Sequence, residues 1–122
     1  MTSSAVALVL ATSACSSGGS DPPEDGFERA MEFCEVGEDP ADVRIDSGGR
    51  ELRINNRGDQ DGSGIPIESV WCLLGELDAP RDVVDAMVAT SARDGAQDDE
   101  WGGYEVTWTY HPDNGLDVFI FR

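Results

Sequence analysis

The sequence contains no lysine and a single histidine, His111, among its 122 residues. Eight arginines stand against 25 aspartates and glutamates, which gives a formal net charge of −17 at pH 7. A surface this acidic repels phosphate backbones and anionic headgroups, so nucleic acid is disfavoured as a partner. We interpret most of the negative charge as a solvated surface that keeps the chain soluble.

The sequence also lacks a catalytic constellation. One histidine cannot supply a multi-histidine metal site, and no Gly-x-Ser-x-Gly turn is present to activate a serine. Between Tyr110 and Pro112, His111 is most simply a residue at the edge of a turn. We therefore predict no catalytic residues, no metal site and no cofactor, and we do not expect an enzyme.

Long apolar runs are missing as well. The run Ala5–Ala11 (AVALVLA) is near the lower limit for the hydrophobic region of a signal peptide, and a membrane-spanning helix needs about 20 such residues. Small residues follow at positions 12–14, then Cys15, and then a stretch rich in serine, glycine and proline. We predict a signal peptide over residues 1–14, a flexible tether over 15–26 and one domain over 27–122.

The stretch Ala11–Cys15 (ATSAC) resembles a bacterial lipobox. The resemblance implies that the Cys15 sulfur receives a lipid, that the chain is cut before this residue, and that the domain is held at the extracytoplasmic face of the cell membrane. Two or three acyl chains would make that attachment lasting. The alternative is an ordinary secretory signal with a cleavage site near a cysteine.

Only three cysteines are present. If Cys15 carries lipid, Cys34 and Cys72 remain as an even pair in an exported, oxidising compartment. We therefore predict a Cys34–Cys72 disulfide.

Apolar periodicity predicts an α+β fold, with two helices packed on an antiparallel sheet. These two helices are expected over about 66–77 and from a cap at Asp78 to Gly95, and a short helix over about 27–35 precedes them after the capping box of residues 25–28. An N-terminal hairpin is expected over residues 43–54, and a C-terminal three-stranded meander over 97–101, 104–111 and 116–121. The register of the last hairpin stays open, because Trp108 faces Phe119 if residues 112–115 form the loop and Ile120 if Pro112 pairs with Leu116.

The stretch Trp108–Val118 (WTYHPDNGLDV) closes a longer segment, residues 101–118, which resembles the C-terminal half of small uncharacterised secreted lipoproteins of high-GC Gram-positive bacteria. The resemblance implies secretion and a compact domain, and it brings no active site with it.

These observations favour a membrane-anchored binding domain that contacts a protein of the cell envelope. Its candidate binding surface combines the polar face of one strand with aromatic residues at its edges: Trp101, Tyr104, Thr107, Thr109, Phe119 and Phe121. An alternative is a calcium-responsive domain that uses the acidic loop over residues 55–64 or the carboxylates of residues 98–100. An enzyme that recruits His111 is the third hypothesis.

Overall fold

The computed structural model describes residues 22–39, 41–57 and 64–122. Within these residues the helices are α1 (Gly26–Phe33), α2 (Ile67–Glu76) and α3 (Arg81–Val88). The strands are β1 (Val43–Asp46), β2 (Glu51–Asn55), β3 (Gln97–Trp101), β4 (Tyr104–His111) and β5 (Gly115–Phe121). Two 3-10 helices, η1 (Ser47–Gly49) and η2 (Ala92–Asp94), complete the described elements.

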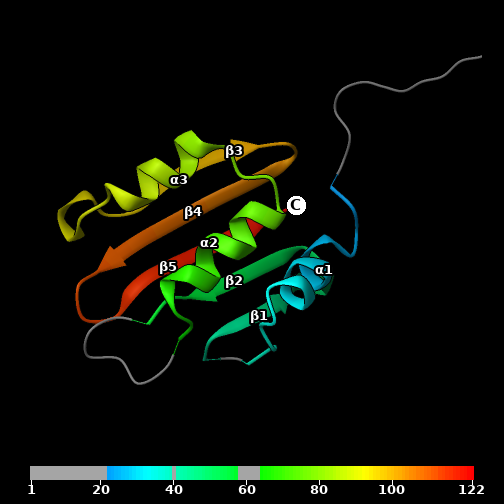
Figure 1. The fold of residues 1–122 in the computed structure, drawn as a ribbon. Helices are drawn as coiled ribbons and strands as arrows, with labels where there is room; N and C mark the ends of the chain where they lie inside the picture. The colour runs from blue at the N-terminus through cyan, green and yellow to red at the C-terminus, as the bar shows by residue number, and fades with distance from the viewer. Residues whose placement is uncertain (1–21, 40, 58–63) are drawn as a thin grey trace, which may run out of the picture.

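The strands form one antiparallel sheet in the order β1-β2-β5-β4-β3. The predicted hairpin and meander are therefore joined edge to edge, because β5 pairs with β2 on one side and with β4 on the other. The helices pack on one face of this sheet and leave the other face open (Figure 1). The α+β fold expected from the sequence is confirmed.

The core lies between the helices and the covered face of the sheet. Side chains along strand β4 alternate between the two faces of the sheet, as predicted. Val106 and Trp108 are buried on the covered face, whereas Glu105 is exposed on the open face. The largest fully buried side chains come from both layers: Trp108, Phe27, Leu52, Leu73, Leu74 and Ile120.

Among the described residues, no helix is long and apolar enough to cross a membrane.

The predicted disulfide between Cys34 and Cys72 is confirmed, with their Cα atoms 5.9 Å apart. Cys34 is the C-cap residue of α1, and Cys72 lies within α2. The bridge therefore fastens the end of the first helix to the middle of the second, where both side chains are half-buried.

The prediction that α3 continues to Gly95 is wrong. The helix ends at Val88, and Ser91 adopts an extended conformation that starts η2. The side chains of Ser91 and Asp94 form a capping box there, in which the Ser91 N–H donates to Asp94 Oδ2 at 2.7 Å. A new helix start so close to the end of α3 breaks the longer helix that the apolar pattern suggested.

The predicted N-cap of α3 at Asp78 is also wrong, because Pro80 occupies that position. Asp78 instead takes the left-handed conformation, with φ of 64°, just after α2. Its N–H donates to the Gly75 carbonyl at 3.0 Å and the Ala79 N–H to the Leu74 carbonyl at 2.9 Å. This pair of bonds is a Schellman motif, which satisfies the last carbonyls of a helix.

The register of the β4–β5 hairpin matches neither expected alternative. His111 pairs with Gly115, so the loop holds only residues 112–114 and Trp108 pairs with Val118. Phe119 pairs with Thr107, which puts Phe119 and Phe121 on the open face. The strand is central in the sheet, and its apolar residues on the covered face are buried.

Candidate binding surfaces

The six residues of the expected binding surface divide between the two faces of the sheet. Thr107 and Thr109 of β4, with Phe119 and Phe121 of β5, share the open face. Trp101 and Tyr104 lie on the covered face, with exposed fractions of 9% and 6%. The structure therefore assigns four of these residues to one surface and the other two, Trp101 and Tyr104, to the core.

Trp101 and Tyr104 hold together the end of the core near α1. The indole Nε1 of Trp101 donates to the Leu77 carbonyl at 2.9 Å, beyond the last turn of α2. The Tyr104 ring lies 5.8 Å from the ring of Phe27 and 5.6 Å from that of Trp101, centroid to centroid. Burial raises the pKa of Tyr104 above 10.0, although the positive charge of Arg122 opposes this shift.

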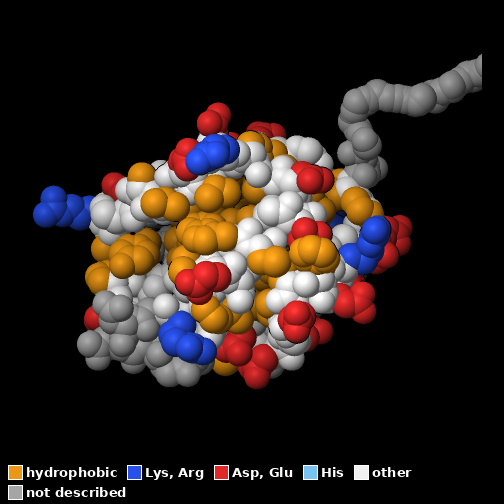
Figure 2. All heavy atoms as spheres, in the orientation of Figure 1, with side chains coloured by type: hydrophobic (Ala, Val, Ile, Leu, Met, Phe, Trp, Pro, Cys, Tyr) orange, Lys and Arg blue, Asp and Glu red, His pale blue; other side chains and the backbone are white. Residues whose placement is uncertain are grey.

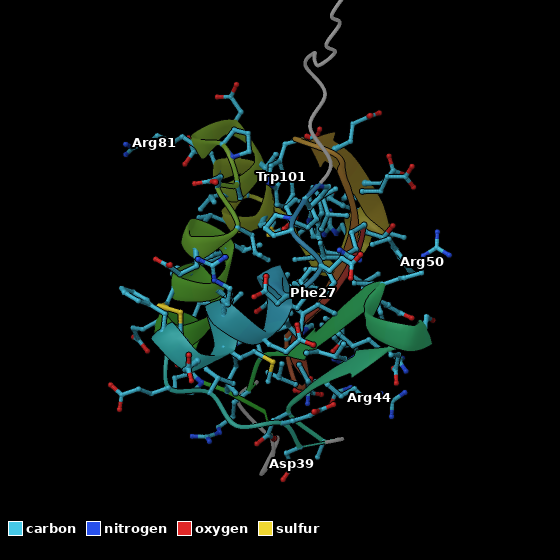
Figure 3. The ribbon with its side chains drawn as sticks, turned by 90° about the vertical axis from the view of Figure 1, so that its right-hand side faces the viewer. Phe27, Asp39, Arg44, Arg50, Arg81 and Trp101 are labelled. Atoms are coloured by element: carbon cyan, nitrogen blue, oxygen red, sulfur yellow. A yellow bond between two sulfur atoms is a disulfide. The ribbon has the colours of Figure 1, made fainter. Side chains whose placement is uncertain are left out.

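On the half of the open face formed by β1 and β2, arginines pair with carboxylates. Arg44 donates through Nε to Asp46 Oδ2 at 2.7 Å, and Arg53 lies within 4.0 Å of the carboxylates of Asp46 and Glu51. The Arg53 guanidinium carbon stands 4.9 Å from the centroid of the Phe119 ring and so covers part of it. Figure 3 shows the helices on one side of the sheet and Arg44 reaching out on the other.

The other half of the open face, over β3 and β4, is acidic. Asp98 pairs with Thr107, and Glu100 pairs with Glu105, so three carboxylates share this face. They line a shallow hollow of about 460 Å³ together with Phe121, which is 40% exposed. Among the residues that the structure describes, no arginine lines this hollow. The surface therefore combines negative charge with one exposed aromatic ring.

The carboxylates of residues 98–100 do not form a calcium site. Asp99 pairs with Val106 and so points to the opposite face from Asp98 and Glu100. Across residues 22–39, 41–57 and 64–122, no group of three or more His, Cys, Asp or Glu side chains could hold a metal ion. Most of the loop suggested as a calcium site, residues 58–63, lies outside the described residues.

The described ends of that loop are fixed by hydrogen bonds. Asn56 is buried, and its Nδ2 donates to the Ile65 carbonyl at 3.0 Å while its Oδ1 accepts from the Leu116 N–H at 3.3 Å. The Arg57 guanidinium donates to the Gly64 carbonyl at 3.0 Å. These contacts attach the start of α2 to the beginning of β5.

His111 is the last residue of β4, and its side chain is exposed. Its Nδ1 accepts the Asp113 N–H at 3.2 Å, within the turn that leads to β5. This contact agrees with the expectation that His111 is a residue at the edge of a turn.

An apolar groove that the sequence did not indicate lies on the helix side of the sheet. It has a volume of about 460 Å³, and its apolar lining comes from four elements: Ile67 and Trp71 of α2, Met87 and Val88 of α3, Tyr110 of β4 and Leu116 of β5. Figure 2 shows this apolar surface over the space between α2 and α3, with acidic side chains beside it.

Two large apolar side chains of the groove are exposed to solvent. Val88 is 66% exposed and Tyr110 is 38% exposed, whereas Met87 and Leu116 are buried and form its floor. Exposed apolar patches of this kind mark interaction sites more often than scattered single residues do. The groove and the acidic half of the open face are therefore the two candidate binding surfaces. Comparison with protein-family models found no matching family, and comparisons with curated proteins and with solved structures found no match either.

Proposed function

We propose that this chain is a lipoprotein domain, held at the extracytoplasmic face of a membrane through a lipid on Cys15, that acts by binding a protein of the cell envelope. The disulfide between Cys34 and Cys72 carries the proposal. Disulfides of this structural kind persist in oxidising compartments, outside the cytoplasm. The bridge accounts for two of the three cysteines and leaves Cys15, the one that follows the signal-like run, for lipid.

The place where the chain enters the fold suits a tether. Pro22 and Pro23 line a hollow of about 350 Å³ with Trp101 and Tyr104, and the Pro23 carbonyl accepts from the Arg122 guanidinium at 3.0 Å. Cys15 stands seven residues before Pro22. A serine- and glycine-rich tether of that length spans roughly 15 Å r.m.s.. The end of the domain that carries Pro22 would then stand next to the headgroups.

The acidic half of the open face supports a binding role and indicates the charge of one partner. Its hollow presents Asp98, Glu100 and Glu105 around Phe121, and its described lining contains no arginine. Cationic side chains with an apolar portion, such as the stem of an arginine, would complement both features. Thr107 offers a hydroxyl on the same face.

The test of the anchor is metabolic labelling with a fatty acid in a high-GC Gram-positive host, followed by intact-mass analysis. We expect a mature chain that begins at Cys15 and carries acyl chains, and we expect Cys15→Ser to abolish both the label and membrane association. An unlabelled wild-type chain in the soluble cytoplasmic fraction, with Cys34 and Cys72 reduced, would overturn the anchor and the location together.

The test of the binding surface is crosslinking in intact cell envelopes, with a photoreactive residue placed at Phe121. We expect a discrete adduct from this position, and we expect Glu100→Gln together with Glu105→Gln to reduce it. A photoreactive residue at Ser47, in the exposed turn between β1 and β2, is the control. Adducts of equal pattern and yield from both positions would contradict a specific surface.

A further inference from the structure

We propose that the groove between α2 and α3 binds a second class of ligand: an apolar side chain on a protein segment that carries lysine or arginine within about one helical turn. The groove is defined by Ile67, Trp71, Met87, Val88, Tyr110 and Leu116. The inference rests on the proposed binding function, but it concerns a different surface and does not depend on the lipid.

The lining of the groove favours a protein side chain. Trp71 is half-buried and Tyr110 is partly exposed, so part of each ring is accessible to a ligand in the groove while the rest packs within the fold. Aromatic residues and methionine are enriched at the centres of protein interfaces. Met87 on the floor adds a side chain that adapts to the shape of an inserted group.

Two of the polar side chains that line the groove, Asn56 and Thr90, are already engaged within the fold. Asn56 bonds to the backbone of Ile65 and Leu116. Thr90 Oγ1 donates to the Ala86 carbonyl at 2.7 Å and accepts from Trp108 Nε1 at 2.8 Å. Because these groups are occupied, recognition inside the groove depends mainly on apolar contact and shape.

Ser91, a third polar residue of the lining, is also engaged within the fold. Its hydroxyl lies 3.3 Å from Asp94 Oδ2, within the capping box of η2. The carboxylate of Asp94 is therefore directed back into its own turn.

The charges beside the groove determine which partner fits. Glu68 follows Ile67 and stands three residues before Trp71, so its carboxylate lies beside the α2 wall. Asp85 stands three residues before Val88 and flanks the α3 wall in the same way. Both residues are exposed. Together they provide one negative charge on each side of the apolar lining.

The net charge of the chain excludes a second copy as the favoured occupant. Two molecules of charge −17 repel each other, whereas a segment bearing lysine or arginine is attracted. Arg57 and Arg93 also lie toward this end of the molecule, but Arg57 is directed to the Gly64 carbonyl. Glu68 and Asp85 lie on the same two helices as the lining residues Trp71 and Val88.

The groove lies at the end of the molecule opposite to the tether. It is built where α2 begins and where α3 and β4 end, whereas the chain enters the fold beside the end of α2 and the start of β4 (Figure 1). The 10 residues of α2 separate these two ends by about 15 Å along the helix. On an anchored molecule the groove would therefore face away from the membrane and be open to a protein partner.

The experiment uses the chain carrying Cys15→Ser, purified in oxidised form, so that its outcome is independent of lipid attachment. The probe is a 14-residue amphipathic helical peptide of leucine and lysine, whose binding is measured by calorimetry. Two further peptides are controls, one with every leucine changed to serine and one with every lysine changed to glutamate. We expect binding of the leucine–lysine peptide alone.

The protein variants are Val88→Asp in the groove and Phe33→Asp, a matched control on α1 whose exposed fraction of 68% is close to the 66% of Val88. Both add one negative charge at an exposed site. We expect Val88→Asp to weaken binding at least tenfold and Phe33→Asp to change it less than twofold. Tyr110→Ser, which removes the ring without adding charge, should weaken binding by about the same factor as Val88→Asp.

Three results would overturn the proposal. The first is no binding of the leucine–lysine peptide at millimolar concentration. The second is equal binding of the peptide in which serine replaces leucine, since this would mean attraction by net charge alone. The third is an unchanged affinity in Val88→Asp and Tyr110→Ser, with both variants shown to be folded by circular dichroism.

Discussion

The disulfide between Cys34 and Cys72 should contribute a large share of the stability of this fold. It closes a loop with a sequence separation of 38 residues. The chain-entropy relation gives a stabilisation of about 4 kcal/mol for such a loop. For a domain of this size, that loss lowers the melting temperature by roughly 15–30 °C. Both cysteines are half-buried, so replacing sulfur by oxygen adds only a small further cost from lost apolar burial.

The assay is urea and thermal unfolding of the oxidised chain and of the double variant Cys34→Ser/Cys72→Ser, both in a Cys15→Ser background. A second comparison is the chain that is folded with its disulfide formed and is then treated with a reducing agent. We expect the double variant to unfold at much lower urea concentration and with a larger m-value, because its unfolded chain is less compact without the bridge. A free energy of unfolding within about 1 kcal/mol of the oxidised chain would refute the reasoning, because the bridge would then constrain little of the unfolded state.

Three further predictions concern single side chains. Trp101→Phe removes the donor to the Leu77 carbonyl and should lower the free energy of unfolding by about 1–3 kcal/mol in urea titration, and an unchanged midpoint would contradict this. Gly64→Ala would put a Cβ atom 2.8 Å from a backbone nitrogen, so it should lower the melting temperature more than Gly48→Ala, which has nothing within 4 Å, and equal shifts would count against local crowding. The Tyr104 hydroxyl loses its proton at a higher pH in the folded chain than in the unfolded chain, because burial raises its pKa. Its contribution to stability is therefore present below about pH 10 and is lost as the pH rises further. Tyr104→Phe should remove this part of the alkaline loss in urea titrations between about pH 8 and 11, and an identical pH dependence in both proteins would refute the assignment.

Much of the fold follows from hydrophobic periodicity. The alternation of Val106 and Trp108 with polar residues predicted the covered face of β4, and the apolar stripe around Val70 and Leu74 predicted α2. These patterns are reliable because they report directly which side chains leave water. The pairing of Cys34 with Cys72 followed from the number of cysteines and the expected compartment.

The ends of the helices could not be predicted in the same way. Asp78 after α2 and Glu35 after α1 both adopt left-handed conformations, with φ of 64° and 57°. Glycine usually marks such positions, since other residues are strained there. Asp78 looked instead like the cap of the following helix, because aspartate is a common N-cap residue.

The candidate site was predicted only in part. Tyr104 stands an even number of residues from Trp108, so alternation alone assigns it to the covered face, and Trp101 pairs with Tyr104 on that same face. The groove could not be predicted from the sequence for a different reason. Its lining joins Ile67 and Val88 to Tyr110 and Leu116, and only the packing of helices on the sheet brings these separate segments together.

The central position of β5 determines when this fold can form. Glu51 of β2 pairs with Phe121 of β5, and Glu105 of β4 pairs with the same residue from the other side, so the two halves of the sheet meet only through this strand. A ribosome delivers β5 after every other strand, and the long loop that it must close is slow to form. Until β5 is present, no strand joins the β1–β2 pair to the β3–β4 pair. The pairing of β2 with β5, which lie far apart in the sequence, is therefore the step that completes the sheet.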